Sequence, residues 1–138
     1  MTRQEKYPNH KNFTFYNRNP KGRITTDCVV RAMSTALSVP YEKVVMDMAK
    51  IQCELGLDDA EPKSIEKYLT ANGWLKNRQP KHENGTKFTC KEFVNAHPKG
   101  KYILSLAHHL TYLEDGKIFD IWDCYKHGGC VGNYYTEG

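Results

Sequence analysis

The residues of this chain best suited to covalent chemistry are Cys28, His109 and one of two later aspartates, Asp120 or Asp123. Cys28 follows capping residues and precedes an apolar stripe with i, i+3, i+4 spacing, so a helix is expected to begin there. Unpaired N–H groups at a helix start favour a negative charge and lower the pKa of a thiol, which makes this cysteine a candidate nucleophile. His109 would serve as general base and then general acid, and the aspartate would orient its imidazole.

Each of these residues also has an ordinary structural interpretation. A free cysteine is often a small buried apolar residue, and a histidine on a strand is often hydrogen-bonded in the core. We favour the catalytic hypothesis because three features coincide. Cys28 is predicted at a helix start, His109 is predicted on a strand, and the two follow the chain order Cys, His, Asp.

The register of one hairpin decides which aspartate lies beside the histidine. An Asp-Gly dipeptide between alternating apolar runs predicts a hairpin over residues 109–122. A two-residue turn places Trp122 opposite His109 and puts Asp120 on the same face of the hairpin. A three-residue loop puts Asp123 on that face instead, because side chains alternate between the two faces. The pattern itself leaves both registers open.

The remaining elements are predicted from periodicity, caps and turn residues. Helices come first and strands dominate the last third, which predicts an α+β fold with N-terminal helices packed on a C-terminal antiparallel sheet. Residues 1–24 are rich in turn formers and are expected to be irregular apart from one short strand. The expected helices cover about 27–37, 41–55, 62–72 and 90–96, and the expected strands about 12–16, 74–75, 101–107, 109–114, 117–122 and 131–135.

Length and composition exclude several classes of protein. The 138 residues fit one domain, 1–138, and a hydrophobic fraction of 39% argues against disorder. The net charge of +4 is mild and its basic residues are spread along the chain, which argues against a nucleic-acid partner. No apolar run approaches the length of a membrane span, and no hydrophobic signal segment is present, so a cytoplasmic location is expected. Five cysteines, an odd number, are then expected to be reduced.

Three segments together resemble the small papain-like cysteine peptidases encoded mostly by phages and their bacterial hosts. These segments are Asp-Cys-Val-Val-Arg-Ala-Met at 27–33, Lys-Tyr-Ile-Leu-Ser-Leu-Ala-His-His-Leu-Thr at 101–111, and Asp-Gly-Lys-Ile-Phe-Asp-Ile-Trp-Asp-Cys at 115–124. That family is related to the peptidase domain of bacteriocin-exporting transporters. The resemblance covers about residues 24–135 and implies a papain-like fold that hydrolyses a peptide or related amide through an acyl-enzyme.

The resemblance also implies roles for individual residues. Cys28 matches the nucleophile and His109 the base. Relatives end the second hairpin strand in an Asp before a small residue, which favours Asp123 over Asp120. These enzymes usually carry a Gln or Asn shortly before the nucleophile to bind the oxyanion. Here Asn19 is the nearest amide, and the Cys28 backbone N–H is the other expected donor.

Substrate contacts are expected around this site. We predict that Trp122 and Tyr16 touch a peptide or protein substrate, and that the N-terminal segment and the loop at 76–87 flank the groove, because loops carry recognition on a rigid scaffold.

Three other hypotheses stay open. The same fold could be a binding module without chemistry, such as a phage inhibitor or host-interaction protein. The same triad could transfer an acyl group to an amine, as transglutaminases do. The spacing of Cys124, His127 and Cys130 could supply three zinc ligands but lacks a specified fourth, so no metal or cofactor is predicted.

Overall fold

The computed structural model describes all residues from 1 to 138 and contains six helices and six strands. The helices are α1 (Arg3–Lys6), α2 (Cys28–Leu37), α3 (Tyr41–Leu55), α4 (Pro62–Ala71), α5 (Cys90–Ala96) and α6 (Cys124–His127). The strands are β1 (Phe13–Phe15), β2 (Trp74–Asn77), β3 (Lys101–Leu106), β4 (His109–Glu114), β5 (Lys117–Asp120) and β6 (Tyr134–Glu137).

All six strands form a single sheet in the order β1-β5-β4-β3-β6-β2. The molecule is therefore α+β as predicted, but two details of the prediction are wrong. The sheet is mixed and not purely antiparallel, because β1 pairs in parallel with β5. The strand predicted at about residues 131–135 forms later in the chain, at Tyr134–Glu137, where it pairs with β3 on one side and β2 on the other.

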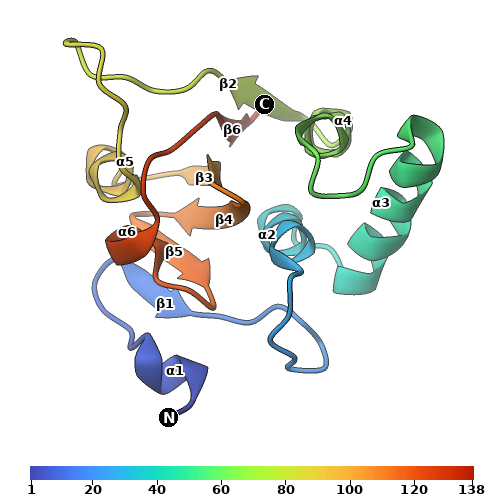
Figure 1. Ribbon diagram of the computed structural model, residues 1–138, viewed down its shortest axis with the longest axis horizontal. Coiled ribbons are helices and arrows are strands. Elements are labelled where there is room, and N and C mark those ends of the chain that lie inside the picture. Colours follow the sequence, from blue (N-terminus) through green and yellow to red (C-terminus); the bar gives the residue numbers. More distant parts are fainter.

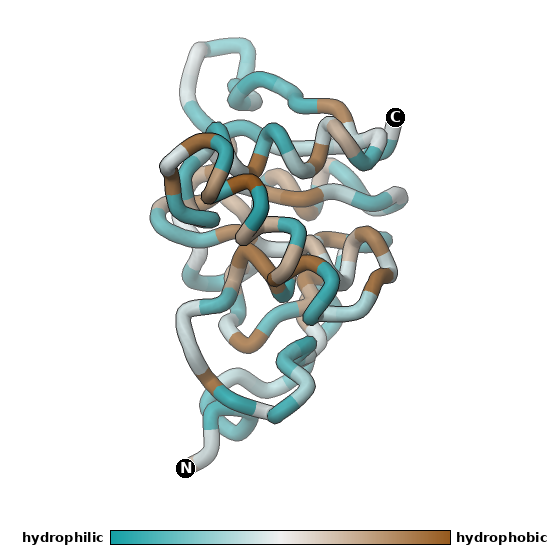
Figure 2. The backbone as a smooth tube through the Cα atoms, turned by 90° about the vertical axis from the view of Figure 1, so that its right-hand side faces the viewer, coloured by the Kyte–Doolittle hydropathy of each residue, from teal (hydrophilic) through white to brown (hydrophobic).

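Helices cover both faces of the sheet, as Figure 1 shows. Helices α2, α3 and α4 pack on one face around a core that includes Met33, Leu69 and Ile103. Helices α5 and α6 pack on the other face around Phe93, Leu113 and Ile118. The hydrophobic stretches of the chain gather in the middle of the molecule, while the N-terminal segment at its lower end is mostly hydrophilic (Figure 2). Burial on both faces makes the central strands a rigid support for side chains at their ends.

The hairpin of β4 and β5 has the two-residue turn. Glu114 pairs with Lys117 and Tyr112 with Phe119, so Asp120 lies opposite Thr111 and on the same face as His109. Asp115 and Gly116 form the turn with φ values of 48° and 78°, the left-handed region that Asp and Gly tolerate. This register decides the geometry of the site.

Candidate active site

Cys28 is the first residue of α2, as the capping pattern predicted. Its side chain is half-buried, and its backbone N–H donates to no acceptor within the protein. Asp27 occupies the N-cap position but does not bond the helix N–H groups through its side chain. The positive end of the helix is therefore left for the thiol and for a negative charge that develops beside it.

His109, the first residue of β4, connects the thiol with a buried carboxylate. Its Nε2 lies 2.6 Å from Oδ2 of Asp120. The imidazole also lies close enough to the Cys28 thiol for each group to shift the pKa of the other, and Nδ1 is the ring nitrogen that Asp120 leaves free for the thiol. Trp122 packs edge-on against the imidazole at 90°, with ring centroids 5.0 Å apart. These contacts hold the ring in one orientation between Cys28 and Asp120.

Asp120 ends β5 and is almost fully buried, at 2% exposure. Its Oδ1 accepts from Nη1 of Arg31 at 2.8 Å and from the N–H of Ile121 at 2.7 Å. Its Oδ2 accepts from Thr111 Oγ1 at 2.6 Å, besides the bond with His109. Burial alone would raise the pKa of this carboxyl, but these bonds and the charges of His109 and Arg31 lower it. Asp120 is therefore an ionised orienting group.

The pKa values of the cysteine and the histidine shift toward an ion pair. Burial raises the pKa of Cys28, but hydrogen bonds from His109 and from the Leu110 N–H, with the nearby positive charges, lower it overall. Burial lowers the pKa of His109, but its bonds to Asp120 and Cys28 outweigh that effect and raise it to about 9. Both shifts favour thiolate and imidazolium at neutral pH, the reactive form of such a pair.

The prediction that Asp123 orients His109 is wrong. Asp123 accepts from the imidazole of His10 at 2.7 Å and caps α6 by accepting from the Lys126 N–H. Asp120, the alternative left open by the hairpin pattern, takes the place beside His109 because the turn has two residues. Asp123 instead connects the N-terminal segment to the chain after β5.

Asn19 does not act as the expected oxyanion donor. Its side-chain amide donates to Asp27 at 3.0 Å, and it lines a surface depression that does not include Cys28. Of the two predicted donors, only the Cys28 N–H is free. The Asn19 bond does have a local consequence, because it helps fix the carboxylate next to the nucleophile position.

A cleft runs across Cys28 and has two lobes. We call the first the apolar lobe, a cavity of about 340 Å³ whose apolar lining includes Val29, Pro62, Ile65, Leu106 and Leu110. The second has about 510 Å³, and we call it the polar lobe after the arginine and threonine side chains in its wall; it is lined by Arg3, Ile24, Thr25, Thr26, Ile121 and Trp122, among others. Cys28, Ala60, His108 and His109 line both lobes, so the thiol lies at their junction.

Some of the predicted substrate-contact residues line the cleft and others do not. Trp122 lines the polar lobe next to His109, so its role as a substrate contact stays a prediction. Tyr16 lines neither lobe: it lies in a packed gap behind Cys28 that has no room for a water molecule, and its hydroxyl accepts from Arg18 at 2.8 Å. The loop at 76–87 also lies outside the cleft, whereas the N-terminal segment reaches it through Arg3.

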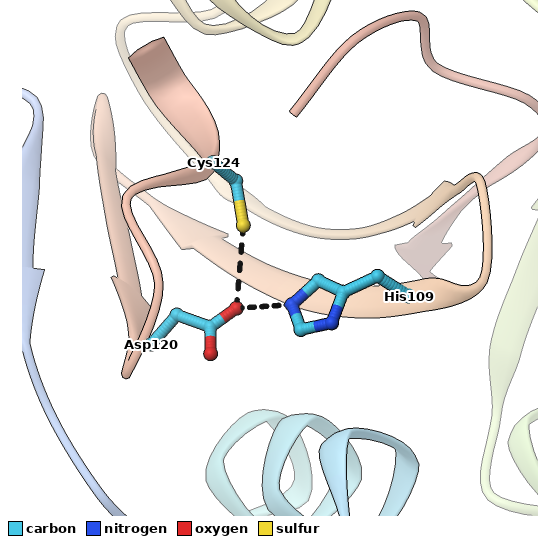
Figure 3. Close-up of side chains that lie close together, drawn as sticks. All are labelled: His109, Asp120 and Cys124. Atoms are coloured by element: carbon cyan, nitrogen blue, oxygen red, sulfur yellow. Dashed lines mark hydrogen bonds and ion pairs between the residues drawn. The ribbon is translucent and has the colours of Figure 1, made fainter. Parts of the chain in front are cut away.

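A second thiol, Cys124, lies on the other side of Asp120. Figure 3 shows Asp120 between His109 and Cys124, whose Sγ donates to Oδ2 at 3.4 Å. Burial raises the pKa of Cys124 well above its ordinary value, so this thiol is inert. The carboxylate is already saturated by donors, and the Arg31 charge beside it opposes a cation. The three side chains therefore form a hydrogen-bond network and do not resemble a metal centre. The spacing of Cys124, His127 and Cys130, which left a zinc site open, does not bring these three residues to one point.

Arg31 and Thr111, which donate hydrogen bonds to Asp120, were not predicted as part of the site from the sequence. Arg31 is buried and bonds Asp27 at 2.7 Å as well as Asp120, so it connects the start of α2 to the end of β5. Only its i, i+4 spacing from Asp27 was visible in the sequence. Thr111 was detectable in principle, because the two-residue register places it opposite Asp120.

Comparisons with protein-family models, with curated proteins and with solved structures gave no match. Among the helices, none combines the length and the apolar character that crossing a membrane requires. The function must therefore be argued from the site itself.

Proposed function

We propose that this protein is a cysteine peptidase or amide hydrolase of papain-like fold, in which Cys28 is the nucleophile, His109 the general base and acid, and Asp120 the orienting carboxylate. One observation carries the proposal: His109 bonds a buried, ionised Asp120 and lies beside the Cys28 thiol, and Cys28 and His109 line an open cleft. Nucleophile, base and orienting acid in hydrogen-bond contact are the signature of covalent acyl transfer.

The proposed reaction assigns each step to a residue of the site. The Cys28 thiolate attacks the amide carbonyl carbon, and the carbonyl oxygen takes up the negative charge near the free Cys28 N–H at the start of α2. The His109 imidazolium then gives its proton to the leaving amine, which breaks the C–N bond and leaves a thioester on Cys28. Water attacks the thioester with His109 as base, the C–S bond breaks, the carboxylic acid product is released and the Cys28–His109 pair is restored.

Thiol chemistry gives the first test. Iodoacetamide should alkylate Cys28 across pH 5 to 9 with an apparent pKa below the free-thiol value of about 8.5. The His109→Ala variant should lose this activation, and mass spectrometry should locate the label. Ordinary labelling that does not depend on His109 would contradict the proposal and would favour a binding module in the same cleft.

Turnover gives the second test. A defined mixture of peptides, incubated in water enriched in ¹⁸O, should yield new carboxyl termini that contain the isotope. The Cys28→Ser variant, which should stay folded because the residue lies at a helix end, is the matched control. Products that instead carry an added amine would identify acyl transfer, and equal turnover by Cys28→Ser would exclude Cys28 as nucleophile.

A further inference from the structure

The polar lobe contains an arginine that no carboxylate of this chain neutralises. Arg3 donates from Nε to the backbone oxygen of Ile121 at 2.6 Å, and its guanidinium carbon lies 5.3 Å from the centre of the Tyr7 ring. It forms no ion pair, and its two Nη groups donate to no acceptor in the protein. Glu5, the nearest acid in sequence, is bonded to the backbone of Thr2 in a capping box.

The contacts of Arg3 fix the guanidinium at the wall of the cleft. Ile121 directly follows Asp120, and Trp122 next to it packs on His109. Arg3 is therefore held by the segment that forms the site, and it lines the polar lobe but not the apolar lobe. Arg31, the other arginine of this lobe, is already paired with two aspartates. Arg3 is the cation of the lobe that remains available to a ligand.

We propose that Arg3 binds a carboxylate of the substrate, so that the site selects peptides with an acidic group on the part that occupies the polar lobe. The guanidinium presents parallel N–H groups that match a carboxylate, and a side chain already held in place loses little freedom on binding. The inference rests on the proposed function, since it assumes that the cleft receives the substrate. The carboxylate is either an acidic side chain or the C-terminus of a peptide.

Thiol reagents of matched shape test this without a known substrate. The neutral reagent is the amide of N-iodoacetylglycine. N-iodoacetylglycine itself supplies a terminal carboxylate, and the α-amide of N-iodoacetylglutamate keeps a side-chain carboxylate as its only carboxylate. With each reagent Cys28 forms an S–C bond and iodide leaves. The measured quantity is the rate with the acidic reagent divided by the rate with the neutral one, corrected for the same ratio with a free small thiol.

In the native protein this ratio should exceed unity by about three- to tenfold for at least one acidic reagent, as expected for a partly exposed charge-assisted pair. Arg3→Gln should bring it close to unity, and Arg3→Lys should retain part of it. Lys6→Gln is the matched control: it removes one positive charge from the same helix, but Lys6 does not line the cleft, so the ratio should persist. The acidic reagent with the higher ratio identifies the source of the carboxylate.

An equal ratio in the native protein and in Arg3→Gln would overturn the proposal, and so would an equal loss in Lys6→Gln. Failure of the proposed function has a different signature. In that case the neutral reagent would label Cys28 slowly and without dependence on His109, while the ratio would still report whether Arg3 attracts the carboxylate.

Discussion

Replacing Asp120 with Asn is the sharpest test of the site, because it removes one charge and hardly changes the shape. The carboxylate accepts four close hydrogen bonds, two of them from Arg31 and His109. The amide of Asn has one oxygen and one NH₂ group. The two donors that now bond the oxygen replaced by the NH₂ group would therefore face a donor and lose their acceptor. Removing one partner of a buried ion pair costs about 3–5 kcal/mol of unfolding free energy. Domains typically have an unfolding free energy of about 5–15 kcal/mol, so the variant should still fold.

The chemistry should change along with the stability. Without Asp120 the pKa of His109 should fall from about 9 toward or below its ordinary value of about 6.5, and the pKa of Cys28 should rise. Urea denaturation measures the loss of unfolding free energy. The pH dependence of Cys28 alkylation and the NMR titration of the imidazole measure the two pKa changes. Asp120→Asn should therefore shift the alkylation profile to higher pH.

The control is Asp123→Asn, which alters the neighbouring carboxylate that holds His10. It should destabilise the protein by about 1 kcal/mol, as a weakened cap and one lost hydrogen bond would, and leave the Cys28 profile unchanged. The reasoning is refuted if Asp120→Asn leaves the profile at the native position, or if Asp123→Asn displaces it equally.

Two further outcomes follow from the same contacts. Since the pKa of His109 is about 9 in the folded protein and about 6.5 unfolded, its stabilisation is complete below pH 6.5 and is lost as the pH rises through 9. That loss is at most about 3 kcal/mol, and His109→Gln should flatten this part of the stability curve measured by urea denaturation. Burial raises the pKa of Cys90 to about 12 and that of Cys124 well above its ordinary value, so brief alkylation of the native protein should label Cys28 and spare both. Early label on either buried thiol, located by mass spectrometry, would contradict the buried network.

Elements with strong local signals were predictable from the sequence. Helix α3 begins and ends where its apolar spacing and Gly56 place it, and α5 follows Thr89 with the complete capping box. The four-residue helices α1 and α6 were missed because so short a segment has no period to read. The parallel pairing of β1 was missed because three residues carry no sign of their partner.

The sequence could not decide which aspartate, Asp120 or Asp123, lies beside His109. Side-chain alternation reduced the question to the length of one turn, and the turn length decided for Asp120. The resemblance to a family pointed to Asp123 through a sequence pattern that does not carry the register. The contact of Arg31 with Asp120 spans 89 positions of the chain, and only the packing of α2 against the sheet creates it.

That contact explains how a buried site can hold a charged thiol. Asp27 and Asp120 carry one negative charge each and Arg31 one positive charge, so the cluster has a net charge of −1 before Cys28 reacts. Transfer of the thiol proton to His109 moves charge within the cluster and leaves that sum unchanged. Asp120 stabilises the imidazolium, and the imidazolium with Arg31 stabilises the thiolate. Activation of Cys28 therefore needs no new counterion, because folding has already brought the compensating charges together.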